Sequence, residues 1–500
     1  MSTHNNDFNV TDGPHSNVVM PSRRDLFYDG GWKAATSGRT IEIYSPSTQE
    51  SLGQIADASV KDVDAAIQAA HRAFRSWRKT SPDERMAVVK RLAQVLRDNS
   101  DDLGLLDAVD SGNPVRSMRA DVHWMANIAD FYTGLLSEVK GETFMTPEGV
   151  MNFTVRQPYG VVASLAAFNH PVLNTLIQVI PALLTGNTAV LKPSQFTSLA
   201  SLRIAELTAD ILPKGVFNVV TGGAECGAAL TRHKLTPLVT LIGSVPTARS
   251  VMRGMADRIK SGLMELGGKN ALIACADADP VKVAAGAVLG MNFTSTSSQS
   301  CQSNSRIFLH KDIYDATLAE IIMRVSALKC GDPRDPNTQV GAMTSREQYQ
   351  KVSNYIKIGK EEGGRVVCGG GPPDDKALAN GLFIQPTVFA DVTQDMRIAQ
   401  EEIFGPVMSV LRWEDEEKLM EQVNSVEYGL SGSVWTPDLA KAHRLAAEMD
   451  VGYVWINNCG IPYFGAPIGG FKQSGIGRVM CFQQLMEMTQ VKNLHIKMDG

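Results

Sequence analysis

One cysteine of this sequence lies among polar residues, where a thiol can do chemistry instead of packing. Most cysteines in proteins behave as small buried hydrophobic residues. Cys301, in contrast, is surrounded by hydroxyl and amide side chains, which favour a loop that faces a cleft. These polar neighbours are Ser297, Ser298, Gln299, Ser300, Gln302 and Ser303. A thiolate in such a loop can attack a carbonyl carbon, so we predict that Cys301 is a nucleophile.

Attack on a carbonyl carbon requires two further groups, and the sequence contains a candidate for each. The oxygen that becomes negative needs a neutral donor, which the side-chain amide of Asn169 can supply together with the backbone N–H of Cys301. Release of a product that stays bonded to the cysteine would need a base that activates water, and the carboxylate of Glu265 is a candidate. Each residue also has an ordinary interpretation, because asparagine is common in turns and a glutamate before two glycines is commonly a solvated loop charge.

The elements that must position these residues begin with two amphipathic helices. The first is predicted to start after Ser59, where Asp62 completes a capping box, and its apolar residues recur at helical spacing. The second is predicted to start after Ser81, with Pro82 at the first helical position. These helices lead into the main domain.

From residue 160 onward, short apolar runs alternate with stretches of helical length, which predicts a parallel sheet buried on both faces. The runs span residues 161–166, 188–191, 216–220, 239–242 and 271–275. A second alternating region, from 305 to about 453, predicts a second α/β domain. Ligands of doubly wound sheets bind at the carboxyl ends of the strands, so the residues after each run are the place to look for chemistry.

The motifs at these strand ends, taken together, resemble those of the aldehyde dehydrogenase superfamily. They are Ala167-Phe168-Asn169-His170-Pro171, Lys192-Pro193-Ser194-Gln195, Gly243-Ser244, Glu265-Leu266-Gly267-Gly268-Lys269-Asn270, Glu401-Glu402-Ile403-Phe404-Gly405-Pro406 and the glycine-rich segment 469–478. The resemblance extends from about Tyr28 to Lys492, with the motifs in the family's order and at its spacing. It implies an enzyme that oxidises an aldehyde to the carboxylic acid with NAD(P)+.

The resemblance implies a role for each of the three candidate residues. Cys301 would form a thiohemiacetal with the aldehyde, Asn169 would belong to the oxyanion hole, and Glu265 would assist hydrolysis of the thioester. Two alternatives remain open: an acylating semialdehyde dehydrogenase that uses coenzyme A, and a catalytically silent structural relative. The acylating branch of the family lacks a base at the position of Glu265, and a silent relative would be expected to have lost one of the three residues.

The resemblance also implies a coenzyme site for NAD, with NADP possible. Lys192 would reach the adenosine ribose, the helix that begins after Ser244 would accept the pyrophosphate, and Glu402 would hold the nicotinamide ribose, with Phe404 beside the ring. The complete set of coenzyme residues is Phe168, Lys192, Ser194, Gln195, Gly243, Ser244, Leu266, Gly267, Glu402 and Phe404.

Several positions depart from the family pattern. Gln195 stands where most NAD-dependent members have glutamate, so the charge that repels a 2′-phosphate is absent. Ala248 replaces a glycine of the pyrophosphate motif. Gln178 and Val479 replace a lysine and a glutamate that are thought to relay protons, which leaves open how protons depart during deacylation.

The resemblance assigns the substrate pocket to residues that are more polar and less aromatic than is usual in the family. They are His170, Asn174, Ile177, Ser300, Gln302, Cys459 and Ile468. The partner that they imply is a small-molecule aldehyde, and they do not identify which one.

The resemblance implies three structural units: a Rossmann-like coenzyme domain (1–138 and 159–267), an α/β catalytic domain (268–484) and a β oligomerisation element (139–158 and 485–500). In the last unit, a hairpin near 141–157 and a terminal strand at 490–497 would leave sheet edges that need partners. A homodimer or homotetramer is therefore expected.

Composition narrows the class of protein further. The 500 residues exceed one hydrophobic core, and 48 basic against 53 acidic residues leave a net charge of −5 with no basic run, so no nucleic-acid partner is expected. Residues 1–22 lack a secretory h-region, and no apolar stretch is long enough to span a bilayer, which predicts a cytoplasmic protein without a membrane partner. Seven dispersed cysteines and nine histidines form no metal motif, so no metal is expected.

Overall fold

The computed structural model describes residues 17–460 and 462–498. The sequence predicts no secretory signal in the segment 1–22. Residues 1–16 of this segment lie outside the described residues. The last two residues of the predicted oligomerisation element, 499 and 500, also lie outside them. Among the described residues, no helix is long and apolar enough to cross a membrane.

An eight-stranded sheet forms the first half of the molecule, and its four central pairings are parallel. Its strands in spatial order are β2 (Gly31–Lys33), β1 (Leu26–Tyr28), β9 (Phe217–Val219), β8 (Thr188–Lys192), β7 (Val161–Leu165), β10 (Leu238–Ile242), β11 (Ser261–Glu265) and β21 (Gly475–Ile476). The predicted doubly wound α/β class is confirmed.

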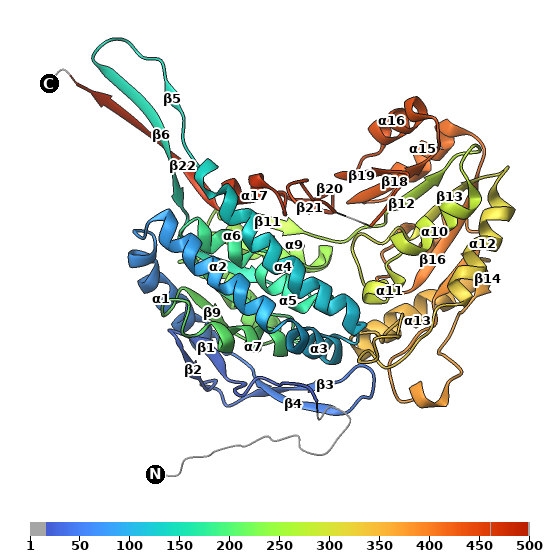
Figure 1. The fold of residues 1–500 in the computed structure, drawn as a ribbon, viewed down its shortest axis with the longest axis horizontal. Coiled ribbons are helices and arrows are strands. Elements are labelled where there is room, and N and C mark those ends of the chain that lie inside the picture. Colours follow the sequence, from blue (N-terminus) through green and yellow to red (C-terminus); the bar gives the residue numbers. More distant parts are fainter. Residues whose placement is uncertain (1–16, 461, 499–500) are drawn as a thin grey trace.

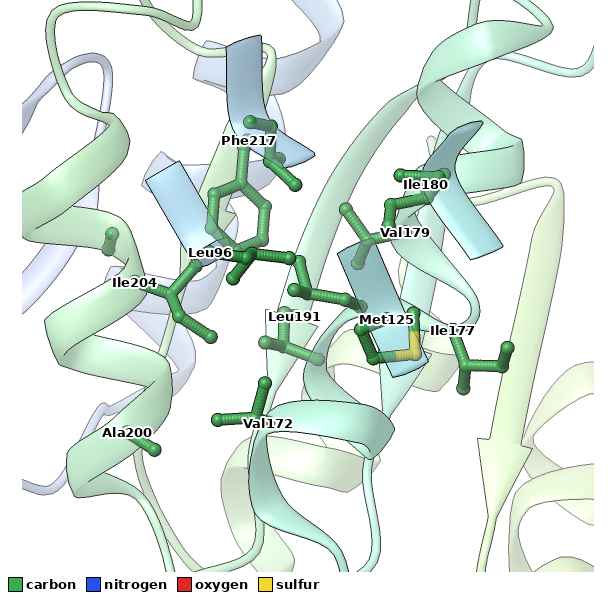
Figure 2. Packing of buried hydrophobic residues seen from close by; sticks show 14 of the residues in the cluster. Leu96, Met125, Val172, Ile177, Val179, Ile180, Leu191, Ala200, Ile204 and Phe217 are labelled. Carbon is green, nitrogen blue, oxygen red and sulfur yellow. The ribbon is translucent and has the colours of Figure 1, made fainter. Parts of the chain in front are cut away.

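Helices cover both faces of this sheet, which explains the continuous apolar runs of its strands. One face packs against α2 (Pro82–Asp98), α4 (Val115–Leu135) and α7 (Leu199–Thr208). Figure 2 shows this side, where Leu191 of β8 lies close to Met125 of α4. The opposite face packs against α1 (Val60–Trp77), α8 (Ala224–Arg232) and α9 (Val245–Ala256).

Two of these helices begin where the sequence predicts. Ser59 accepts a hydrogen bond from the backbone N–H of Asp62, whose carboxylate accepts one in return from the backbone N–H of Ser59. Ser81 and Glu84 form the same reciprocal capping box at the start of α2. Each cap satisfies backbone donors that would otherwise lack a partner, which typically contributes about 1 kcal/mol.

A seven-stranded sheet forms the second half, and all of its pairings are parallel except that of β14 with β15. In spatial order the strands are β14 (Arg365–Cys368), β15 (Thr387–Ala390), β16 (Val407–Trp413), β13 (Arg306–His310), β12 (Ala271–Ala274), β18 (Ser431–Trp435) and β19 (Tyr453–Ile456). One face packs against α10 (Pro280–Gly290) and α12 (Tyr314–Ser326), and the other against α13 (Arg346–Glu361), α15 (Glu416–Asn424) and α16 (Leu439–Glu448).

The apolar run 271–275 does not belong to the first sheet, with whose strands its apolar pattern groups it, although it lies within the predicted catalytic domain. It forms β12, which lies between β13 and β18 in the second sheet, and β11 takes the fifth parallel position in the first sheet. Only residues 266–270 separate β11 from β12. A parallel return within one sheet needs a crossover of a dozen or more residues, so this short link has to lead into a different sheet.

The predicted boundary of the catalytic domain at residue 484 needs a correction as well. β21 pairs antiparallel with β11 at Gly475 and Ile476, so the chain returns to the first sheet before that boundary. The following helix α17 (Phe482–Glu487) buries Leu485 in the core that α2 and α4 share. β21 covers the edge of β11 and supplies backbone hydrogen-bond partners that β11 would otherwise lack, which stabilises the return of the chain to this sheet.

A three-stranded sheet extends away from the body of the molecule (Figure 1). It consists of β22 (Thr489–Lys497), β6 (Val150–Pro158) and β5 (Thr143–Phe144), with β6 in the middle. The hairpin and terminal strand predicted from the sequence are therefore both present. β22 and β6 pair antiparallel along their full length, from Thr489 opposite Pro158 to Lys497 opposite Val150.

Candidate active site

One large cavity, of about 910 Å³, runs past the carboxyl ends of β7, β8, β10 and β11 to the loop that carries Cys301. Nearly all of the residues predicted for the site line this cavity. They are Phe168, Asn169, His170, Asn174, Ile177, Lys192, Ser194, Gln195, Gly243, Ser244, Glu265, Leu266, Gly267, Ser300, Cys301, Gln302, Glu402, Phe404 and Ile468. A volume of this size suits an extended ligand.

The loop that carries Cys301 follows the short helix α11 (Phe293–Thr296) and is fixed by hydrogen bonds from outside. The side-chain amide of Asn270 donates to the carbonyl oxygens of Cys301, at 2.7 Å, and Ser303, at 3.0 Å. Gly268 permits this approach, because a Cβ atom there would lie 2.3 Å from the oxygen of Cys301. The motif that contains Glu265 therefore also holds the nucleophile loop in place.

Asn169 lies between β7 and helix α5 (Pro171–Leu176), and its side chain points at the cysteine loop. Its Nδ2 donates to the carbonyl oxygen of Gln299 at 2.8 Å, and its Oδ1 accepts from Nδ2 of Asn174 at 3.1 Å. Asn174 thus orients the amide so that its donor side faces the loop, and one of the two N–H groups of Nδ2 remains for a ligand. The backbone N–H of Cys301 donates to no backbone carbonyl of another residue in the described part of the chain, and it lies near the Cys301 thiol, whose pKa it lowers slightly against the other effects.

Glu265 is the last residue of β11, and its carboxylate is buried in the cavity wall. Among the described residues, Oε1 has no hydrogen-bond partner. Burial raises the pKa of Glu265 well above its usual value; the charge of Arg478 opposes this shift and that of Glu487 adds to it. A carboxylate with a raised pKa and an unsatisfied oxygen is suited to accept a proton from water.

The thiol of Cys301 is partly buried, and its surroundings favour the protonated form. Burial, followed by the charges of Glu402 and Glu265, raises the pKa of Cys301 to about 12. The thiol therefore keeps its proton until a base removes it.

The far end of the cavity lies at the end of β8. Lys192 is buried there, burial lowers its pKa, and its Nζ donates to the carbonyl oxygen of Pro193 at 2.9 Å. Ser194 and Gln195 follow it and line the same space, opposite Gly223. A Cβ atom at Gly223 would lie 3.2 Å from Oε1 of Gln195, so the two segments approach closely.

The N-terminus of α9 opens onto the cavity beside these residues. Ser244 caps this twelve-residue helix by accepting a hydrogen bond from the backbone N–H of Thr247 at 3.4 Å. Gly243 precedes it, and both residues line the cavity as predicted. The free N–H groups and dipole of a helix N-terminus favour an anionic group at this point.

Glu402 reaches the cavity from the loop before β16. Its Oε1 accepts a hydrogen bond from the backbone N–H of Gly268 at 2.9 Å. Burial raises the pKa of Glu402, while the Gly268 hydrogen bond, Lys351 and Lys269 oppose that shift. A Cβ atom at Gly267 would lie 2.4 Å from Oε2 of Glu402, so a side chain there would force the carboxylate out of its present position.

Phe404 follows Glu402 with a φ of 59°, a left-handed conformation that is uncommon for an aromatic residue. The side-chain amide of Gln348 holds this turn by donating to the carbonyl oxygens of Phe404, at 2.7 Å, and Ile403, at 3.2 Å. The ring of Phe404 meets that of Phe168 edge to face at 5.6 Å. These aromatic side chains come from opposite halves of the molecule and meet in the cavity wall.

Cys459 is the one predicted pocket residue that does not line the cavity. It is buried in the core of the second sheet, and its Sγ lies 2.8 Å from the carbonyl oxygen of Gly286 on α10. The chain turns at Gly460, whose φ is 73°, so that Gly460 and Pro462 face the cavity and Cys459 faces the core.

The cavity residues that the sequence missed include four from α4 and α13, two helices outside the recognised motifs. Asp121 and Trp124 lie on α4, and Gln348 and Lys351 lie on α13. In each pair the residues are three apart, which places them on one helix face. Helical spacing could have shown the shared face, but it does not say that this face borders a cavity.

The positions of the family's proton relay hold no charge in this chain. Gln178 is buried, its Oε1 accepts from Nε2 of Gln484 at 3.1 Å, and its own Nε2 has no partner among the described residues. Val479 forms a backbone bridge with Ile468. The charged groups that act on Glu265 are instead Arg478 and Glu487.

Comparisons with known proteins agree with this site. The model of the Aldehyde dehydrogenase family matches residues 32–494. The chain is 44% identical over 494 residues to Aldehyde dehydrogenase tropH from Talaromyces stipitatus, over 97% of this chain and 96% of that relative. It is 38% identical over 474 residues to a Betaine aldehyde dehydrogenase from Brucella canis, over 94% of this chain and 97% of the relative.

Solved structures show the same fold. PnpE from Pseudomonas sp. WBC-3 has a TM-score of 0.93 at 36% identity, covering 96% of this chain and 98% of that one. Betaine aldehyde dehydrogenase from Staphylococcus aureus, solved in complex with NAD+, has a TM-score of 0.93 at 33% identity, covering 96% of this chain and 95% of that one.

The fold and the site define an oxidoreductase in which a cysteine thiol lies in a cavity large enough for an extended ligand. The chain belongs to the aldehyde dehydrogenase family. The enzyme class predicted from the sequence is thereby confirmed, and the comparisons lend no support to an acylating enzyme that uses coenzyme A.

Proposed function

We propose that this protein oxidises an aldehyde to the carboxylic acid with NAD+ through a covalent intermediate on Cys301. The observation that carries the proposal is the meeting of Cys301, Asn169 and Glu265 in one cavity, although they come from three separate segments of the chain. Sγ of Cys301 bonds to the carbonyl carbon as its proton leaves to a base, and the oxygen becomes negative. The free N–H of Asn169 and the backbone N–H of Cys301 donate to that oxygen.

The cavity residues also fit a dinucleotide. The N-terminus of α9 can accept a pyrophosphate, Lys192 can donate to ribose hydroxyls at one end, and Glu402 can accept from ribose hydroxyls near Cys301. Gly267 and Gly223 leave the space that side chains would fill. When bound, NAD+ accepts the hydride that leaves the carbon attached to Cys301.

Glu265 completes the reaction in this proposal. The thioester carbonyl is attacked by water, whose proton goes to the carboxylate of Glu265. The bond between Sγ and the carbonyl carbon then breaks, and the carboxylic acid is released. Burial supports this role because it raises the pKa of Glu265 towards the range in which a carboxylate is an effective base.

Two substitutions separate these roles. Cys301→Ala should abolish aldehyde oxidation, because the thiol bonds to substrate. The Kd for NAD+, measured by quenching of tryptophan fluorescence, should stay within about twofold of the wild-type value, because other groups hold the coenzyme. Cys481→Ala, at a buried cysteine outside the cavity, is the control and should keep full turnover. Full turnover by Cys301→Ala would overturn the assignment.

Glu265→Gln should slow hydrolysis of the thioester more than its formation. Rapid mixing should then show a burst of reduced nicotinamide absorbance followed by a slow steady state, because only the second half of the reaction needs the base. Equal slowing of the burst and the steady state would contradict this role and would indicate that Glu265 deprotonates the thiol instead.

We further propose that the protein acts in the cytoplasm as a homodimer or homotetramer. The seven cysteines are free thiols, which suits a reducing compartment. β22 is an outer strand of the projecting sheet and carries exposed apolar side chains, which suits pairing with a second copy.

A further inference from the structure

The wall of the cavity near Cys301 includes one face of α4 that the catalytic roles above do not use. Asp121 and Trp124 lie one helical turn apart on this face, and both line the cavity. α4 is fixed next to the nucleophile loop, because Oγ of Ser117 donates to Oγ of Ser295 at 3.0 Å. These two side chains therefore border the same cavity as Cys301 and can contact a ligand in it.

Asp121 holds the imidazole of His170 in one orientation. Nδ1 of His170 lies 2.6 Å from Oδ2 of Asp121, with side chains that are 21% and 15% exposed. A carboxylate can only accept, so Nδ1 carries the proton that forms this bond. Nε2 has no hydrogen-bond partner among the described residues, and the ring lines the cavity, which leaves Nε2 available to a ligand.

The charge of this pair favours an oxygen atom as the partner of Nε2. Burial lowers the pKa of His170, but the charge and hydrogen bond of Asp121 outweigh burial, and the net shift is upward. The imidazolium form presents an N–H to the cavity, and the neutral form presents a lone pair. A hydroxyl group can pair with either form, whereas a quaternary ammonium group can pair with neither.

Trp124 adds a flat apolar surface next to this polar pair. Its ring lies 4.4 Å from that of Phe464, which in turn stacks on Phe131 at 6.0 Å. Phe131 is itself partly buried against the core of the first half. The three rings back one another, so Trp124 is held as a rigid wall that suits a planar group. This aromatic wall comes from α4, outside the positions that the sequence assigned to the pocket.

We propose that the aldehyde substrate is aromatic and carries a ring hydroxyl, with its ring against Trp124 and its hydroxyl bonded to Nε2 of His170. The inference rests on the proposed oxidation at Cys301 and specifies which aldehydes that reaction takes. Asp121 is a positioning residue here, because it acts on the substrate through His170. The already paired carboxylate of Asp121 has little attraction left for a cationic aldehyde.

The test compares kcat/KM for benzaldehyde, the three hydroxybenzaldehyde isomers, 3-carboxybenzaldehyde and cyclohexanecarbaldehyde. We expect the best hydroxybenzaldehyde to exceed benzaldehyde by at least about tenfold, because a hydrogen bond to a charged donor contributes about that much. We also expect it to exceed the carboxylated ring, because the paired Asp121 and His170 offer a carboxylate no net positive charge. A carboxylated ring that is preferred, or no gain from any hydroxyl, would overturn the proposal.

Substitutions locate the preference. His170→Phe and Asp121→Asn should each reduce the ratio of kcat/KM between the best hydroxybenzaldehyde and benzaldehyde by about tenfold, mainly through KM, while His443→Phe, at an exposed histidine on α16, should leave it unchanged. Trp124→Leu should reduce kcat/KM for benzaldehyde more than for cyclohexanecarbaldehyde. Unchanged ratios in these variants would overturn the assignment.

The same panel distinguishes this proposal from the proposed function. Oxidation of any aldehyde in the panel with NAD+, without a preference for a ring hydroxyl, would refute only the substrate class. If protein that binds NAD+ normally oxidised none of the aldehydes in the panel, the result would refute both the substrate class and the proposed function.

Discussion

The carboxylate of Glu265 shares its surroundings with an opposite and a like charge. Arg478 stabilises the ionised form, and Glu487 destabilises it. Glu487 is itself fixed, since Oε2 accepts from the backbone N–H of Arg478 at 3.3 Å and Oε1 from Nε2 of Gln483 at 2.7 Å. This arrangement lets a single isosteric substitution change the basicity of Glu265 without removing the base.

We predict that Glu487→Gln shifts the pH dependence of thioester hydrolysis to lower pH. A base works when deprotonated, so the rate rises with pH through the pKa of Glu265. Removing the negative charge of Glu487 lowers that pKa, and the rising limb should move down by about 0.3 to 1 pH unit. The measurement is the single-turnover rate of acyl-enzyme hydrolysis between pH 5 and 9.

The control for this experiment is Glu417→Gln, which removes the same charge at an exposed position on α15 and should not move the profile. An unmoved profile in Glu487→Gln, or one displaced to higher pH, would contradict the electrostatic coupling between the two carboxylates.

At the scale of single residues, the sequence identified those that lie at strand ends or in loops with a recognisable sequence pattern. Cys301, Asn169 and Glu265 are of this kind, and all three line the cavity. The sequence did not predict Asp121 and Trp124 as site residues, because a helix has several faces and only tertiary packing decides which face borders a cavity. Cys459 was misplaced because the turn at Gly460 reverses which side chain faces inward.

We expect the strand end at β8 to govern coenzyme choice. Lys192 and Gln195 leave the same strand and line the same part of the cavity. Glutamate at position 195 would accept hydrogen bonds from a ribose but would repel a 2′-phosphate, whereas glutamine keeps the hydrogen bond without the charge. We therefore predict that the wild type tolerates NADP+ and that Gln195→Glu raises KM for NADP+ about tenfold more than KM for NAD+.

Steady-state kinetics with each coenzyme checks this prediction. Gln54→Glu adds the same charge at an exposed position on β4 (Ser51–Ala56), outside the cavity, and should leave both KM values unchanged. Parallel changes in the two KM values for Gln195→Glu, or a wild type that cannot use NADP+, would contradict the argument.

At the scale of elements, the apolar runs predicted strands correctly but not their sheets. β11 was overlooked because Ser261, Gly262 and Glu265 interrupt its apolar pattern, and β12 was assigned in its place. The length of the link between them carries the missing information, since five residues cannot cross over a sheet. That link is the motif that places Glu265 in one half and Asn270, which holds the Cys301 loop, in the other.

The whole molecule consists of two helix-covered sheets and a β arm that leaves the body (Figure 1). Residues from both sheet-containing halves line one cavity. The arm buries little of its own surface, because three strands without a covering helix expose both faces. Val491 is 56% exposed and Ile496 42% exposed, and Ile496 lies opposite Met151, which is also exposed. An arm of this kind is expected to be stabilised by contact with another copy of the chain.

We predict that the double substitution Val491→Glu and Ile496→Glu lowers the oligomeric state. Like charges introduced on the arm of each copy repel one another and lose apolar contact area at the interface. Light scattering coupled to size-exclusion chromatography should show the wild type as a dimer or tetramer and the variant at a lower mass. Circular dichroism should show an unchanged fold, because both side chains are exposed in the single chain. The control substitutes Met323 and Leu439 by glutamate, two exposed apolar residues on α12 and α16, and should keep the wild-type mass. A monomeric wild type, or a variant that keeps the wild-type mass, would show that the arm does not hold the assembly together.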